Sequence, residues 1–182
     1  YNTGNQLIDI TGNATFEGNE AGDNGNGGAI YLRSDAEYNT GNQLIDIDGD
    51  ATFTSNSAGD EGGAIYMRSD ANDGNTGYQY IDIDGAANLL ENSAVRSGGA
   101  IVMGSYASDD TGSKSIFIDG KATFTTNSAS YGEGGAIFMY SDADNGYTSS
   151  QIIDIDGNAN FEGNSAGEDG GAIWIYSDAD DG

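Results

Sequence analysis

Acidic and amide side chains recur in short clusters that end in glycine, and their spacing suits metal binding. Residues 70–74 read Asp-Ala-Asn-Asp-Gly, and residues 142–146 and 178–182 have the same type of spacing. Such a turn directs oxygen atoms to one side, and several oxygen ligands are what Ca²⁺ requires. A solvated acidic loop is the alternative. The calcium ligands that this spacing predicts are Asp70, Asn72, Asp73, Asp142, Asp144, Asn145, Asp178 and Asp180.

A second acidic set alternates with isoleucine in the motif I-x-I-[DT]-G. Like charges about 5 Å apart in neighbouring strands repel by about 0.8 kcal/mol in water and more near a protein surface. Raised pKa values, backbone N–H donors at the following turn, or Ca²⁺ would each offset this repulsion. The carboxylates in these rows, which are further candidate calcium ligands, are Asp46, Asp48, Asp82, Asp84, Asp154 and Asp156.

The composition excludes several classes of function. The 182 residues include 30 Asp and Glu but only 5 Lys and Arg, which gives a formal net charge of −25. Such a charge disfavours nucleic acid as a partner. With no Cys and no His, the chain has no disulfide, zinc site or Ser–His–Asp triad. No apolar run approaches the roughly 20 residues of a spanning helix, so we expect no membrane insertion. A saline environment would also explain the acidity.

One motif set repeats five times along the chain. Gly-Gly-Ala-Ile occurs at residues 27–30, 62–65, 98–101, 134–137 and 170–173. An F-x-x-N element, with Leu for Phe in the third copy, and the I-x-I-[DT]-G element precede each occurrence. Recurrence at a fixed period is typical of solenoid proteins. The repeats are residues 1–37, 38–74, 75–110, 111–146 and 147–182.

Each of the three elements alternates apolar and polar residues with the period of a β-strand. The sequence therefore predicts an all-β fold, a single parallel β-solenoid over residues 1–182 with five coils. Each coil has three short strands and a protruding acidic loop. Ile47, Phe53, Ile65 and Met67, with their counterparts in the other repeats, would form a continuous core of stacked side chains.

The asparagine of F-x-x-N falls at a turn in every repeat. Stacked coils would bring these amides within hydrogen-bonding distance of one another, as in an asparagine ladder. The Gly-Gly pair would permit a tight corner or a positive φ before the third strand. The predicted structural ladder consists of Asn19, Asn56, Asn92, Asn127 and Asn164.

The third strand carries aromatic side chains on the face that alternation directs away from the core. An apolar stripe on a surface usually marks an interface. Three occupants are possible: the loops of the chain itself, another subunit, or a glycan stacked on the rings. The stripe and the column beside it contain Tyr31, Tyr66, Phe138, Trp174, Arg33, Arg68, Tyr140 and Tyr176.

The GGA[ILV] and F-x-x-N repeats resemble those of the chlamydial polymorphic outer-membrane protein family and of related bacterial surface adhesins. The resemblance extends over all five repeats. It implies a right-handed parallel β-helix that is exported to the cell surface and works in adhesion. This chain is unusually regular and acidic for such repeats. The regularity favours a filament or stalk at least as much as a receptor-binding tip.

Both ends of the sequence are in phase with its repeat, and neither carries an atypical capping repeat. Open strand edges invite pairing with a further coil. We therefore expect either an excised piece of a longer array or copies stacked head to tail or laterally into an extracellular fibre. An adhesin segment that binds surface glycans or a host surface is the alternative.

Enzymatic activity is not predicted. A polysaccharide lyase built on this fold needs a basic residue near its calcium, and only Arg33 and Arg68 could serve. A glycosidase needs two carboxylates in different environments. Here the carboxylates occur in near-identical rows. A polysaccharide-degrading enzyme is therefore the least favoured reading.

Overall fold

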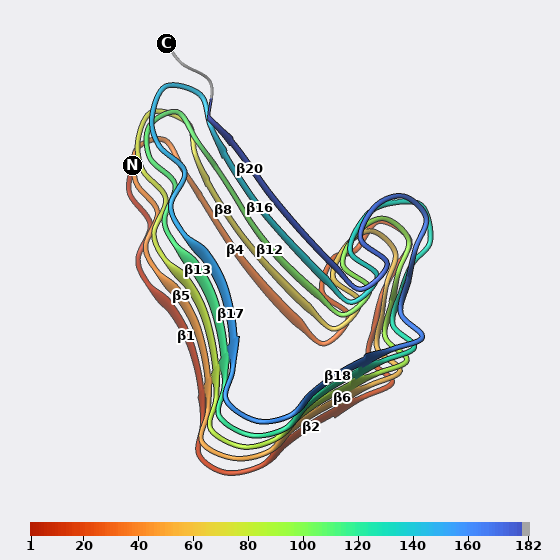
Figure 1. Ribbon diagram of the computed structural model, residues 1–182. Helices are drawn as coiled ribbons and strands as arrows, with labels where there is room; N and C mark the ends of the chain where they lie inside the picture. Colours follow the sequence, from red (N-terminus) through yellow and green to blue (C-terminus); the bar gives the residue numbers. More distant parts are fainter. Residues whose placement is uncertain (180–182) are drawn as a thin grey trace.

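The computed structural model describes residues 1–179, which fold into stacked coils that share one axis (Figure 1). Four parallel sheets of five strands run along the stack, and each coil contributes one strand to each sheet. The predicted all-β parallel solenoid is therefore confirmed. We number the coils 1 to 5 in chain order and name each sheet by its first strand. Residues 1–179 contain no helix long and apolar enough to cross a membrane.

The strands have nearly the same length in every coil. The β1 sheet contains β1 (Gln6–Ile10), β5 (Gln43–Ile47), β9 (Gln79–Ile83), β13 (Lys114–Ile118) and β17 (Gln151–Ile155). The β2 sheet contains β2 (Ala14–Glu17), β6 (Ala51–Thr54), β10 (Ala87–Leu90), β14 (Ala122–Thr125) and β18 (Ala159–Glu162). The β3 sheet contains β3 (Glu20–Ala21), β7 (Ser57–Ala58), β11 (Ser93–Ala94), β15 (Ser128–Ala129) and β19 (Ser165–Ala166). The β4 sheet contains β4 (Ile30–Ala36), β8 (Ile65–Ala71), β12 (Ile101–Ala107), β16 (Ile137–Ala143) and β20 (Ile173–Ala179).

The prediction of three strands per coil was wrong, because the β3 sheet adds a fourth. Its strands have only two residues, too few to show alternation in the sequence. In each coil the ladder asparagine directly precedes this short strand and aligns it with the neighbouring coils. Ser57 and Ala58 therefore pair in register with their counterparts. Ala58 is buried and Ser57 is not.

The core lies between the sheets and is continuous along the stack, as the alternation predicts. Equivalent residues pair directly, so that Ile47 lies between Ile10 and Ile83. Phenylalanine rings stack on one another, with 4.7 Å between the ring centroids of Phe16 and Phe53. Ile47 and Phe53 are fully buried, whereas their counterparts in coils 1 and 5 are only partly covered. A coil therefore buries its apolar face only when it has neighbours on both sides.

Both residues of the Gly-Gly pair are required at the corner before the β4 sheet. Gly62 has φ +67°, a left-handed conformation that favours glycine. At Gly63 a Cβ atom would collide with the carbonyl oxygen of Gly99 in the next coil and lie 2.6 Å from the amide nitrogen of Ser93. The first glycine thus supplies the turn, and the second permits close stacking of the coils.

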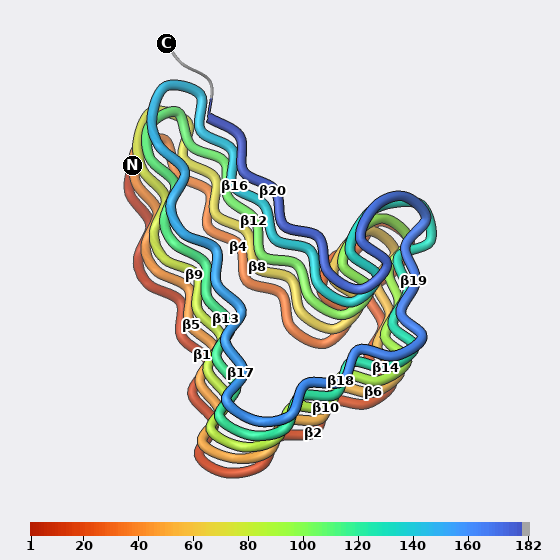
Figure 2. The backbone as a smooth tube through the Cα atoms, in the orientation of Figure 1, coloured from red at the N-terminus to blue at the C-terminus, as the bar shows by residue number. Residues whose placement is uncertain are grey.

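The hook loops connect each strand of the β3 sheet to the following strand of the β4 sheet and curl outward from every coil (Figure 2). The acidic segment on the other side of the β4 sheet also stacks in register. There the amide nitrogen of Asn75 donates to Asn39 Oδ1 at 3.0 Å, and that of Gly77 donates to Thr40 Oγ1 at 2.9 Å. The hook loops comprise residues 22–29, 59–64, 95–100, 130–136 and 167–172.

Candidate functional site: polar columns and an aromatic–acidic face

The five asparagines of the F-x-x-N motifs lie in one ladder at the corner between the β2 and β3 sheets. Asn56 Nδ2 and its amide nitrogen both donate to Asn92 Oδ1, each at 3.0 Å. Asn92 Nδ2 also donates to the carbonyl oxygen of Phe53 at 2.9 Å. Asn56, Asn92 and Asn127 are fully buried, so the ladder supplies partners to backbone groups that water cannot reach.

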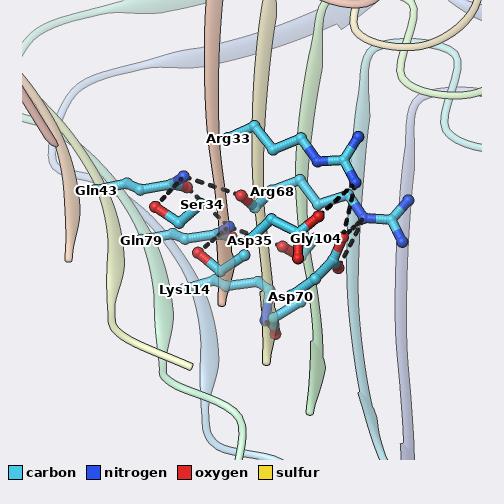
Figure 3. Close-up of polar contacts among 11 residues, drawn as sticks. Arg33, Ser34, Asp35, Gln43, Arg68, Asp70, Gln79, Gly104 and Lys114 are labelled. Atoms are coloured by element: carbon cyan, nitrogen blue, oxygen red, sulfur yellow. Dashed lines mark hydrogen bonds and ion pairs between the residues drawn. The ribbon is translucent and has the colours of Figure 1, made fainter. Parts of the chain in front are cut away.

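A second column of amides, which the sequence analysis missed, lines the start of the β1 sheet (Figure 3). Gln43 Nε2 donates to Gln6 Oε1 at 3.0 Å and to the carbonyl oxygen of Arg68 at 2.9 Å. Gln79 repeats the pattern, with 3.1 Å to Gln43 Oε1 and 2.7 Å to the carbonyl oxygen of Gly104. The recurring Gln two residues before the first Ile of the motif was the signal in the sequence.

Lys114 interrupts this glutamine column in coil 4. Its side chain is fully buried, and Nζ donates to the Oγ atoms of Ser105 and, at 2.6 Å, of Ser141. Burial lowers the pKa of Lys114 to about 7. Gln79 Oε1, which a glutamine at this position would reach, is buried without a hydrogen bond.

The two arginines of the β4 sheet pair with acids on the outer face of the same sheet (Figure 3). Arg68 Nε donates to both carboxylate oxygens of Asp70, at 2.8 and 2.9 Å. Arg33 lies 3.3 Å from Asp35 and 3.5 Å from Asp70. Asp70, a predicted calcium ligand, is therefore a buried strand residue whose nearest charged partners are arginines.

The other predicted ligands of the acidic clusters are spread over strand ends and turns. Asn72, Asp73 and Asn145 are exposed. Asp144 accepts a hydrogen bond from the hydroxyl of Tyr106. The predicted ligand Asp142 lies on strand β16, and Asp178 lies on strand β20. Asp180 is outside the described residues.

The acidic rows of the β1 sheet face outward as the alternation predicts. Burial first, and then the charges of neighbouring aspartates, raise the pKa of Asp46 and of Asp82. Within residues 1–179, no three Asp or Glu side chains lie close enough together to hold a metal ion. Calcium binding stays a prediction. The remaining members of the rows, all exposed, are Asp48, Asp84, Asp154 and Asp156.

The aromatic stripe is covered by the hook loops in the middle coils and is more open at its ends. Tyr66 is 2 % exposed and Phe138 8 %, whereas Tyr31 in coil 1 is 47 % exposed. The buried residues form a small second cluster outside the main core, against which Tyr140 and Trp174 pack. Burial raises the pKa of Tyr66 to about 12. In the middle coils, the stripe is therefore occupied by the chain's own loops, which is the first of the three alternatives.

A groove lined by residues of coils 2, 4 and 5 remains open between the hook loops and the β4 sheet. It encloses about 260 Å³. Trp174 stacks on Phe138 with ring centroids 5.1 Å apart and on Tyr176 with centroids 5.2 Å apart. We call this site the aromatic–acidic groove; its lining residues are Glu61, Glu133, Phe138, Tyr140, Asp142, Trp174 and Tyr176.

Together, these features define a repetitive parallel β-solenoid with one aromatic face. The family model of the Chlamydia polymorphic membrane protein repeat matches the chain at residues 13–33, 50–68 and 158–176. The resemblance in the sequence is thereby confirmed at three places, in coils 1, 2 and 5. Each match begins in the turn before the β2 sheet and ends in the β4 sheet, so it includes both the asparagine ladder and the Gly-Gly corner. Comparisons with curated proteins and with solved structures gave no match.

Proposed function

We propose that this chain is a non-enzymatic structural module of a cell-surface stalk or fibre, which lengthens by stacking coils of different copies in register. The matches to the Chlamydia polymorphic membrane protein repeat support a surface location. Within residues 1–179, equivalent residues form nearly uniform columns, and this regularity supports a structural role. Such a heterologous contact does not close on itself and therefore grows into a filament.

The observation that carries this proposal is an unsatisfied amide in the last coil. Gln151 Oε1 is buried and has no hydrogen-bond partner among the described residues. In coils 1 and 2 the same atom accepts from the glutamine of the following coil, as Gln6 does from Gln43 at 3.0 Å. Gln6 of a second copy, placed one coil spacing beyond coil 5, would supply this donor.

The asparagine ladder offers a second contact of the same kind. Asn127 Nδ2 donates to Asn164 Oδ1 at 3.0 Å, and Asn164 Nδ2 donates back to the carbonyl oxygen of Phe124 at 2.8 Å. The second N–H of Asn164 Nδ2 would reach Asn19 Oδ1 of the next copy in the same geometry. Stacking would also cover apolar side chains that the terminal coils leave partly exposed, such as Phe16 and Phe161.

Sedimentation velocity over a wide concentration range, with electron microscopy of the same samples, tests this proposal. We expect the average particle length to grow with concentration. Ile175 is 48 % exposed at the open end of a core column, so Ile175→Lys should block growth. Leu7→Lys is the matched control, because Leu7 is 60 % exposed on the outward side of strand β1. A wild-type chain that stays monomeric at all concentrations would disprove stacking.

Calcium stabilisation belongs to the same proposal. Burial, and then the charges of neighbouring aspartates, raise the pKa values of Asp46 and Asp82, so the acidic rows also repel one another. A divalent cation between coils would offset this repulsion. Millimolar Ca²⁺ should raise the melting temperature, and a chelator should reverse the effect. High NaCl is the control for charge screening alone. If NaCl and Ca²⁺ raise the melting temperature equally, specific stabilisation by calcium is disproved.

A segment of a surface adhesin is the second candidate, and the aromatic–acidic groove favours it. Stacked rings such as Trp174 and Tyr176 form a flat apolar surface beside carboxylates, an arrangement that suits a bound partner or glycan. Binding to a glycan panel that is lost in Tyr176→Ala, with no growth of particles, would favour this function over the stalk.

A further inference from the structure

We propose that the aromatic–acidic groove binds a cationic side chain, an arginine or lysine in a basic peptide segment of a partner protein. The proposal concerns the side of the solenoid and does not depend on end-to-end stacking. It follows from the groove's rings, its carboxylates and the chain's own use of arginine on the same face.

Four aromatic rings form the floor of the groove. Besides the two stacks of Trp174, the rings of Phe138 and Tyr140 lie 5.2 Å apart at a tilt of 31°. The faces of aromatic rings attract a guanidinium or ammonium group, and tryptophan does so most strongly. Trp174 and Tyr140 are partly exposed and Tyr176 is 39 % exposed, so a side chain from solvent can reach the rings.

Carboxylates line the groove together with these rings. Glu61 and Glu133 come from the hook loops of coils 2 and 4, and Asp142 comes from strand β16. Burial, and then the charge of Asp60, raise the pKa of Glu61, although the charges of Arg96 and Arg68 act to lower it. A further cation beside Glu61 would lower this pKa again. The aromatic rings and the carboxylates therefore both favour a positively charged ligand.

Arg68 shows how the protein itself places a cation on this face. In the β4 sheet, Arg68, Gly104 and Tyr140 are paired neighbours in successive coils. The ring of Tyr140 lies across Gly104, where a Cβ atom would collide with it, and so leans toward Arg68. Arg68 thus lies close to the rings of Tyr66 and Tyr140 and bonds to Asp70. In coil 2 the cation is therefore the guanidinium group of the chain's own Arg68.

Coils 4 and 5 keep the rings and acids of this arrangement but have no arginine. Tyr140 and Tyr176 occupy the positions of Arg33 and Arg68, and no Lys or Arg follows residue 121 in the sequence. Arg96, in the adjoining hollow, is already paired with Asp60 at 3.2 Å. Arg68 and Arg96 already act on Glu61 at one edge of the groove. A further cation, placed beside Trp174 and Tyr176, would have to come from another molecule, and the net charge of −25 would attract it.

Trp174 is the only tryptophan, so its fluorescence reports on the groove alone. The probe is a short glycine-spaced arginine peptide, titrated into the full chain at a concentration where sedimentation shows monomers. The same peptide with citrulline, which keeps the shape but lacks the charge, is the ligand control. We expect a saturable change in Trp174 emission and binding that is about tenfold weaker for citrulline.

A charge-matched pair of variants separates the groove from general acidity. Glu61→Gln with Glu133→Gln should weaken the arginine peptide by about tenfold. Glu17→Gln with Glu20→Gln removes two exposed carboxylates of coil 1 and should have less than about a twofold effect. Far-UV circular dichroism checks that all variants fold.

Three outcomes would overturn the proposal. Equal losses of peptide affinity in the two double variants would mean that the peptide binds only through the net charge of the chain. Equal binding of the citrulline peptide would mean that charge is not recognised. A response of Trp174 to neutral oligosaccharides but not to the arginine peptide would assign the groove to glycans. None of these outcomes bears on end-to-end stacking, which is measured by particle length.

Discussion

Two columns of amide side chains run along this solenoid, and only one of them is unbroken. The asparagine ladder passes through all five coils at a corner, whereas the glutamine column in the β1 sheet is interrupted by Lys114. Both columns are buried in the middle coils. One buried column thus contains a foreign residue and the other does not, and their hydrogen bonds also differ.

The asparagine ladder adds hydrogen bonds to backbone groups at the corner. Asn92 Oδ1 accepts from the amide nitrogen of Asn56, and Asn92 Nδ2 satisfies the carbonyl oxygen of Phe53. A glutamine side chain in the other column bonds to one carbonyl oxygen and otherwise to side chains, as Gln79 does. Loss of a glutamine therefore leaves fewer buried backbone groups without a partner.

The largest expected effect is the loss of one ladder residue. Asn92→Ala would remove the side-chain hydrogen bonds to the amide nitrogen of Asn56 and to the carbonyl oxygen of Phe53, both at a buried corner. At about 1–3 kcal/mol for a buried group left without a partner and about 1 kcal/mol for the other lost hydrogen bond, the free energy of unfolding should fall by about 3 kcal/mol. Urea denaturation monitored by circular dichroism measures it. Asn88→Ala, on the outward side of strand β10, is the control and should cost less than about 1 kcal/mol. Equal losses would contradict a special role for the ladder.

The second prediction repairs the glutamine column. Lys114→Gln would remove a buried ammonium group and place an amide within reach of Gln79 Oε1, which now has no partner. We expect the free energy of unfolding at pH 7 to rise by about 2 kcal/mol. Lys121→Gln is the control for the loss of charge, because Lys121 is exposed. A Lys114→Gln chain that is less stable than wild type would show that Lys114 serves the column better than glutamine.

The third prediction concerns pH. The pKa of Lys114 is lowered to about 7 in the folded chain, against about 10.5 for a solvated lysine. Between these values the unfolded chain binds more protons, so stability should rise with pH, by at most about 1.4 kcal/mol per unit. The buried tyrosines, with raised pKa values, act in the opposite direction above about pH 10. Denaturant midpoints from pH 7 to 9.5 should therefore rise in wild type.

The Lys114→Gln variant isolates the source of this slope. It should be nearly flat over the same range, while Lys121→Gln should keep the slope of wild type. If the slope persists in Lys114→Gln, the pH dependence comes from another group, and burial does not lower the pKa of Lys114 as described.

The same contrast shows what the sequence could predict. The asparagine ladder and the core columns could be predicted, because F-x-x-N and the alternating isoleucines recur in every repeat. The glutamine column was missed although its glutamines recur two residues before the first Ile of the motif, because a polar residue at the start of a strand usually faces water. Lys114 looks like an ordinary surface lysine until the stacking places it between Gln79 and Gln151. Register between distant coils, which no local pattern contains, decided its burial.

The aromatic face illustrates a second limit of the sequence. Alternation correctly placed Tyr66 and Phe138 outside the main core. It could not show that the hook loops would cover them and leave the groove beside Trp174 open. The path of a loop depends on the Gly-Gly corner and on the neighbouring coil, so the groove became visible only in the structure.

The smallest expected effect tests whether the asparagine ladder also carries backbone strain. The residue before each ladder asparagine is left-handed: it is glycine in coils 1 and 5, but in coils 2 to 4 it is a residue with a side chain, such as Thr126 with φ 56°. This conformation costs about 1–2 kcal/mol for such a residue. Thr126→Gly would remove that cost and lose about 0.5–1 kcal/mol through the flexibility of the unfolded chain.

A net gain of about 0.5 kcal/mol is therefore expected for Thr126→Gly. Thr125→Gly, one residue earlier and in the extended strand β14, has no such strain to relieve and should cost about 1 kcal/mol. Opposite signs for these adjacent substitutions in urea denaturation would show that the corner holds the ladder at a conformational cost. If both destabilise the chain equally, the left-handed corner costs nothing there, and hydrogen bonds alone distinguish the two columns.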